Sequence, residues 1–72
     1  MKFELSKNWH EKRQCHVFTA SLADKVSKDE FKRLAYLSRK FGGWYFRKYG
    51  PTPGGFHFLN KSDRDQFLAE VQ

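Results

Sequence analysis

The most regular pattern of hydrophobic positions lies in the middle of the chain. Apolar or small side chains recur at helical spacing at Phe31, Leu34, Ala35, Ser38 and Phe41, which places them on one helix face. Ser27 and Glu30 have the spacing of a capping box, in which the serine hydroxyl accepts the N–H three residues on. Gly42 and Gly43 follow, and a glycine there supplies the left-handed conformation that ends many helices. The pattern predicts an amphipathic helix over residues 28–41.

A second helical pattern, shorter and less regular, lies near the end of the chain. Ser62 and Asp65 repeat the capping spacing, and the apolar residues Phe67, Leu68 and Val71 follow them. Because a serine in this position favours the start of a helix, we expect a short C-terminal helix that begins at Ser62.

Four segments have the composition of β-strands, with β-branched or aromatic residues or alternating apolar positions. They are residues 1–6, 14–20, 44–49 and 56–59. Residues 7–13, around Trp9, are polar and charged and predict a loop, and the prolines and glycines of residues 50–55 predict another. We expect each pair of strands to be antiparallel. The order ββαββα, with the helices on one face of an antiparallel sheet, is a two-layer α+β domain.

Alternation in the last two strands predicts which side chains face the helices. One set consists of Trp44, Phe46, Phe56 and Phe58. If this set faces the helices, the open face of the sheet carries Tyr45, Arg47, Tyr49 and His57. Such an aromatic and cationic face suits the stacking of a base beside a bound phosphate. Cross-strand pairing that only stabilises the sheet is the alternative, and a slip of one residue in register exchanges the two faces.

The composition adds that aromatic residues are abundant for so short a chain. The 72 residues include 8 Phe, 3 Tyr and 2 Trp, and each aromatic side chain buries about 150–250 Å² when enclosed. The expected core consists of Phe31, Leu34, Phe41, Phe56, Phe58 and Phe67. The 13 aromatic residues exceed what so small a core needs, so some of them are expected at the surface. The length fits one small domain over residues 1–72, either a whole protein or a domain excised from a larger one.

The charge is strongly basic and unevenly distributed. The chain has 14 Lys and Arg against 8 Asp and Glu, a net charge of +6, and residues 43–60 contain no acid. Opposite the apolar face of the central helix lie Lys32, Arg33, Tyr36, Arg39 and Lys40. A basic helix face can contact phosphates and release counterions, and an ordinary solvated face is the alternative. Arg47 and Lys48 flank the proline-rich loop, which could reach into a nucleic-acid groove as a basic loop. The alternative is a loop that only connects two strands.

Catalytic and metal chemistry find little support in the sequence. His10, Cys15 and His16 match no zinc spacing, and in one strand His16 points away from Cys15 and cannot activate it. No apolar run approaches the length of a membrane span, and the first residues lack a signal-peptide core. We expect no enzyme, cofactor, metal or membrane contact. The single cysteine indicates a reducing, cytoplasmic compartment.

A series of short motifs runs from Val26 to Leu68: a charged S-x-x-E-F helix start, Gly-Gly, an aromatic-aromatic-x-Arg strand and a Gly-Phe-x-Phe strand. The residues are Ser27, Glu30, Phe31, Gly42, Gly43, Trp44, Tyr45, Arg47, Gly55, Phe56 and Phe58. This order resembles a small module of large phage and conjugative-element proteins, where it accompanies Swi/Snf-type or strawberry-notch-like helicases and DNA methylases. This sequence differs from the module at two points. Phe46 stands where the module commonly has a small polar residue, and the Pro-Thr-Pro loop is longer than the corresponding loop of the module. The resemblance implies an accessory module of a helicase or methylase assembly, without an activity of its own.

Two functions stay open at this point. The first is a nucleic-acid-binding accessory module, with DNA as the expected ligand. Its expected contacts are Lys32, Arg33, Tyr36, Arg39, Lys40, Tyr45, Arg47, Lys48, Tyr49 and His57. The second is a protein docking module that uses surface aromatic residues such as Trp9 and Phe18. Acid-free basic segments favour a polyanion, whereas exposed aromatic residues favour a protein partner. The oligomeric state, the choice between DNA and RNA, and the choice between single and double strands stay open.

Overall fold

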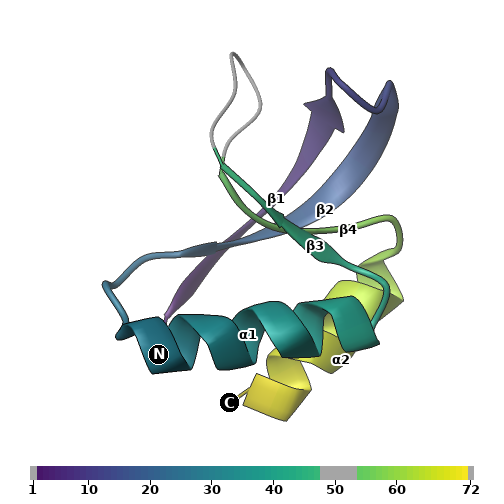
Figure 1. Cartoon of the computed structure of the whole chain (residues 1–72). Helices are drawn as coiled ribbons and strands as arrows, with labels where there is room; N and C mark the ends of the chain where they lie inside the picture. Colours follow the sequence, from purple (N-terminus) through teal and green to yellow (C-terminus); the bar gives the residue numbers. More distant parts are fainter. Residues whose placement is uncertain (1, 48–53, 72) are drawn as a thin grey trace.

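A computed structural model describes residues 2–47 and 54–71 and has the predicted order of elements. The elements are β1 (Phe3–His10), β2 (Cys15–Leu22), α1 (Lys28–Lys40), β3 (Trp44–Phe46), β4 (Gly55–Phe58) and α2 (Lys61–Val71). The strands form one antiparallel sheet in the order β1-β2-β4-β3, and both helices lie on one side of it (Figure 1). The two-layer α+β fold is therefore confirmed.

The two ends of α1 follow the capping signals in the sequence. The Ser27 hydroxyl accepts a hydrogen bond from the Glu30 N–H at 3.1 Å. At the other end, Gly42 adopts a φ of 79° and donates its N–H to the Arg39 carbonyl at 3.0 Å. Gly43 donates to the Ser38 carbonyl at 2.7 Å. This pair of bonds is a Schellman motif, and it ends the helix at the predicted glycines.

The second helix begins one residue earlier than predicted. Lys61 is the first residue of α2, so Ser62 lies inside the first turn and does not cap the helix. Asn60 precedes the helix instead: its carbonyl accepts from the Arg64 N–H at 3.3 Å and its side-chain amide donates to Asp63 at 3.2 Å. Asn60 therefore occupies the position before the first helical residue, where asparagine is as favourable as serine.

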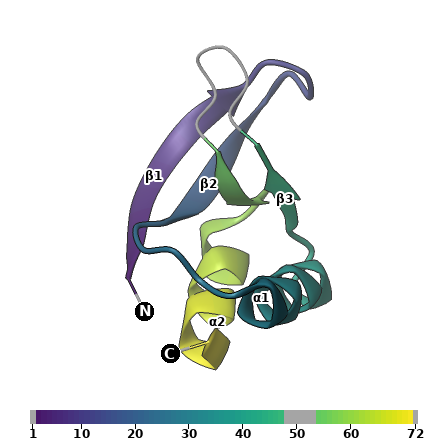
Figure 2. The same cartoon turned by 60° about the vertical axis from the view of Figure 1, so that its left-hand side comes forward.

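The first hairpin is longer than predicted. β1 continues to His10 and pairs with β2 from Phe3 opposite Leu22 to His10 opposite Cys15. The loop predicted over residues 7–13 is therefore wrong, since only residues 11–14 turn. β1 is an edge strand whose side chains are largely exposed, and the polar stretch from Ser6 to Asn8 is held extended by pairing with β2. The turn end of the β1–β2 hairpin extends past the two helices and bends away from the helix layer (Figure 2).

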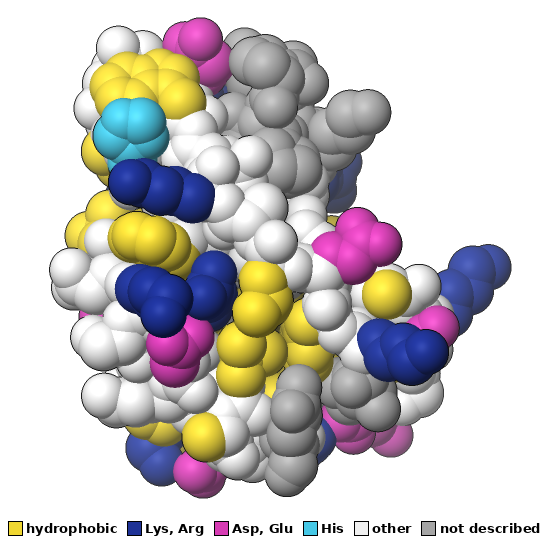
Figure 3. Space-filling model, turned by 180° about the vertical axis from the view of Figure 1, so that it is seen from behind, with side chains coloured by type: hydrophobic (Ala, Val, Ile, Leu, Met, Phe, Trp, Pro, Cys, Tyr) yellow, Lys and Arg dark blue, Asp and Glu magenta, His cyan; other side chains and the backbone are white. Residues whose placement is uncertain are grey.

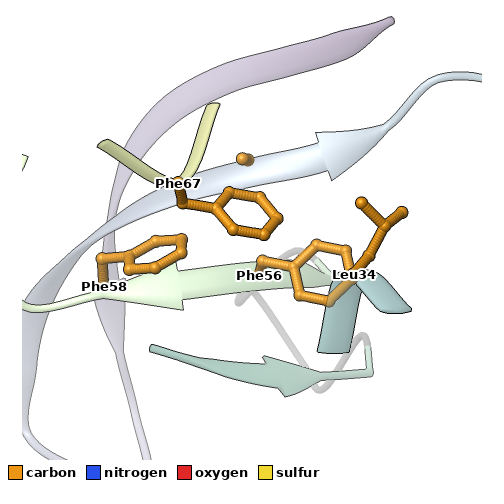
Figure 4. Close-up of a cluster of buried hydrophobic side chains, with 5 residues drawn as sticks. Leu34, Phe56, Phe58 and Phe67 are labelled. Carbon is orange, nitrogen blue, oxygen red and sulfur yellow. The ribbon is translucent and has the colours of Figure 1, made fainter. Parts of the chain in front are cut away.

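The core between the sheet and the helices is built from three phenylalanines, one leucine and one alanine. Phe56, Phe58, Phe67 and Leu34 are fully buried together with Ala20 (Figure 4). The ring centroid of Phe67 lies 5.4 Å from that of Phe56 and 5.2 Å from that of Phe58, so α2 is anchored to the central strand β4. Phe31 and Phe41, also expected in the core, are half-buried at its rim.

The register of β3 and β4 reverses part of the predicted face assignment. Tyr45 lies opposite Phe56 and Trp44 lies opposite His57. Tyr45 is therefore on the helix side with the core phenylalanines, and Trp44 and Phe46 are on the other side with His57. The prediction that Trp44 and Phe46 share a face with Phe56 and Phe58 is wrong. Both faces carry aromatic residues here, so the sequence lacks the polar contrast that would set the register.

Candidate functional site

The exposed side of α1 gathers the five residues that the sequence predicted there. Tyr36 lies in the middle of the helix with 65% of its surface exposed. Its neighbours three and four positions away are all exposed cations: Lys32, Arg33, Arg39 and Lys40. Side chains at these spacings are adjacent on a helix surface. We call Tyr36 and its four cations the α1 basic face.

Two of the four cations contact acids, and two do not. A terminal nitrogen of Arg33 lies 2.6 Å from Glu30, and this hydrogen bond lowers the pKa of Glu30 and raises the pKa of Arg33. Lys40 Nζ lies 3.9 Å from Glu70 of α2. Within the described part of the chain, Lys32 and Arg39 form no ion pair. Ion pairs at the surface contribute little to stability because water screens them, so the face stays available to an anionic ligand.

The predicted hairpin residues divide between the two faces of the sheet. Tyr45 is 45% exposed, and its ring packs edge to face against Phe31 of α1 at 4.8 Å between centroids. It therefore lies beside α1 and not on a separate open face. Arg47 is exposed next to β3. Lys48 and Tyr49 lie outside the described residues, as do residues 50–53 of the predicted loop.

His57 is enclosed in a second cluster, on the side of the sheet away from the helices. This cluster consists of His10, Val17, Thr19, Trp44, Phe46 and His57. His57 is fully buried, and the Arg13 guanidinium lies 4.0 Å from the centroid of the Trp44 ring. The prediction that His57 lies on an open binding face is therefore wrong. The curled β1–β2 hairpin covers it, which the expected loop over residues 7–13 could not do.

The structure also places Trp9 and Phe18, which the sequence indicated as surface aromatic residues, in one row with cations that the sequence did not predict. The row runs along the helix side of the β1–β2 hairpin onto α2, and we call it the hairpin row: Trp9, His16, Lys7, Phe18 and Arg64. Figure 3 shows hydrophobic, histidine and Lys/Arg side chains gathered at the hairpin end of this surface. Leu5, Lys7 and Trp9 occupy alternate positions of the sequence, which places them on one face of a strand. This spacing indicates a shared face only if residues 7–10 belong to β1, as the structure shows.

The described residues offer no other site. Residues 2–47 and 54–71 contain no group of three or more His, Cys, Asp or Glu side chains that could hold a metal ion, and no pocket. Cys15 is half-buried and not in a disulfide. No helix in this part of the chain is long and apolar enough to cross a membrane.

Comparisons with known proteins leave the sequence resemblance as it stood. No protein-family model, curated protein or solved structure matches the chain. The similarity of residues 26–68 to the phage and conjugative-element module therefore stays an expectation.

Proposed function

We propose that this protein is a nucleic-acid-binding accessory module that contacts phosphates through the α1 basic face. The observation that carries the proposal is the arrangement around Tyr36: an exposed aromatic ring with a cation at each of the four neighbouring helix positions. A net charge of +6 on 72 residues supports the same ligand class, because a basic surface attracts a polyanion over a distance.

The length of the face suits several phosphates. From Lys32 to Lys40 the helix rises about 12 Å, and one strand of a duplex presents a phosphate about every 3.4 Å along the duplex axis. Three to four phosphates therefore lie within reach of the four cations. Glu70 is exposed and Glu30 is partly exposed, so a phosphate can replace them on Arg33 and Lys40 at small cost.

Protein docking is the second candidate function. The exposed apolar side chains Leu5, Trp9 and Leu59 favour it, since each has more than two fifths of its surface open to solvent. Docking needs no phosphate contact, so nucleic-acid titrations separate the two candidates.

The test is fluorescence anisotropy with labelled 20-nucleotide single-stranded DNA, duplex DNA and RNA at low salt. We expect the double variant Lys32→Gln/Arg39→Gln to bind all three ligands more weakly, because it removes two phosphate contacts that sequence does not influence. Lys2→Gln/Lys25→Gln removes the same charge from exposed positions off the α1 basic face and should weaken binding much less.

Two results would overturn the proposal. One is the absence of binding to every nucleic acid at low salt, which would leave protein docking. The other is an equal loss in both double variants, which would mean that net charge alone attracts the ligand and that α1 forms no interface.

A further inference from the structure

We propose that the hairpin row is a second binding surface, which stacks an unpaired base of single-stranded nucleic acid on Trp9. The inference rests on the proposed function for its ligand class. It adds a preference for unpaired over paired strands, and it uses residues of β1, β2 and α2 that take no part in the α1 basic face.

Trp9 is an exposed ring that packs against a neighbouring ring. It lies opposite His16 in the hairpin, and the two rings meet edge to face with centroids 5.0 Å apart and planes at 73°. Even so, 42% of the Trp9 surface stays open to solvent. An indole fixed by a neighbouring ring loses little freedom when a ligand stacks on it, which favours binding.

Cations accompany the next ring along the row. Phe18 lies opposite Lys7, whose Nζ is 5.6 Å from the centroid of the Phe18 ring. The Arg64 guanidinium approaches the same ring from α2 at 5.8 Å. Lys7 is two residues from Trp9 on the same strand face, about 7 Å along the strand. A base stacked on Trp9 would thus have a cation beside it for its phosphate.

The hairpin is packed on its other face. His10, Val17 and Thr19 point into the second cluster and are almost fully buried, and the Asn8 side-chain amide donates to the Thr19 hydroxyl at 3.1 Å. The alternation of a strand therefore buries one set of side chains and presents Lys7, Trp9 and the residues opposite them to solvent. Residues held this way form a preorganised surface.

The charge near the hairpin row favours a nucleic acid over a protein as occupant. At the turn beyond Trp9, Lys12 adds a positive charge next to the acid Glu11, while Arg13 lies against Trp44 on the other side of the sheet. Of the nearby acids, Asp65 already contacts Arg64 at 3.2 Å and Lys61 at 3.6 Å. Stacking on an exposed ring requires a base that is not already stacked in a duplex, so the row selects single strands.

The chain offers a direct optical test, because it contains 2 tryptophans. In a Trp44→Phe variant, Trp9 is the only indole, and its emission reports on the row. We expect a 10-nucleotide oligothymidine to quench this emission saturably, and a duplex of equal length to change it little. A far-ultraviolet circular dichroism spectrum like that of the parent verifies that the variant folds.

In the parent chain, we expect Trp9→Ala to weaken oligothymidine binding about 5- to 150-fold, the equivalent of about 1–3 kcal/mol for one stacked base. The salt dependence and the duplex affinity should not change. Trp9→Phe should recover part of the loss because it keeps a ring. Leu5→Ala, an exposed apolar residue on the same face of β1, is the matched control and should bind like the parent.

Three outcomes would overturn the inference, and they are distinguishable. Salt-dependent binding that is unchanged by Trp9→Ala, with no quenching, refutes the hairpin row and leaves the proposed function intact. The absence of all nucleic-acid binding refutes both. Trp9 emission that changes with protein concentration alone, and self-association that Trp9→Ala abolishes, would show that the row binds a second copy of the chain instead.

Discussion

His10 is a buried titratable residue whose protonated form the fold disfavours. It is 1% exposed, its ring centroid lies 4.3 Å from that of Phe46, and its Nδ1 accepts the Arg13 N–H at 3.3 Å. Within the described residues, its Nε2 has no hydrogen-bond partner. Burial, followed by the positive charge of Arg13, lowers the pKa of His10 below its usual 6.5.

This lowered pKa predicts a loss of stability in mild acid. Below about pH 6.5 the unfolded chain takes up a proton at His10 that the folded chain resists, so the free energy of unfolding falls as pH decreases toward the folded-state pKa. Urea unfolding at pH 7.5, 6.5 and 5.5 measures this fall. His10→Phe should flatten it, whereas His16→Gln, at an exposed position, should keep it. Equal pH profiles for the parent and His10→Phe would contradict the prediction.

At the scale of elements, the connection from α1 to β3 depends on two adjacent glycines for different reasons. Gly42 has a φ of 79° and space around it, the nearest atom to an added Cβ being 4.0 Å away. Gly43 lies against the core: an added Cβ would overlap the Phe58 ring and lie 2.8 Å from the His57 carbonyl oxygen. The first position requires glycine for its conformation and the second for its lack of volume.

The two substitutions should therefore differ in effect. Gly42→Ala should cost about 1–2 kcal/mol from backbone strain. Gly43→Ala forces a buried aromatic ring to move and should cost about 1–3 kcal/mol or more, with a change in near-ultraviolet circular dichroism that Gly42→Ala does not produce. Urea unfolding measures both. A Gly43→Ala protein with the stability and spectrum of the parent would contradict the packing of Phe58 described here.

The sequence predicts an element correctly where the residues that determine it lie within a few positions of one another. It does not predict features that depend on pairing with a strand distant in the sequence. The capping serine and the glycine pair located α1 because both act within one turn of the chain. The extension of β1 to His10 depends on pairing with β2, and the sheet face of Tyr45 depends on its register with Phe56. The α1 basic face followed from helical periodicity alone, whereas the hairpin row required the correct length of β1.

For the whole molecule, the fold leaves two surfaces of different chemistry. The α1 basic face presents cations at helical spacing, which suits phosphates, and the hairpin row presents an exposed ring beside a cation, which suits an unpaired base. The longest extent of the molecule is 30 Å, the length of about nine base pairs at 3.4 Å each. A 20-nucleotide ligand is therefore long enough to hold a complete site.

The salt dependence of binding tests the central claim most directly, since phosphate contacts release counterions and stacking does not. The measurement is the association constant of the parent for a 20-base-pair duplex between 50 and 200 mM salt. With three to four phosphates on the α1 basic face, log K against log salt should fall with a slope of about −3 to −4, and Lys32→Gln/Arg39→Gln should flatten it by about two. A slope near zero, or no binding at 50 mM salt, would contradict the account.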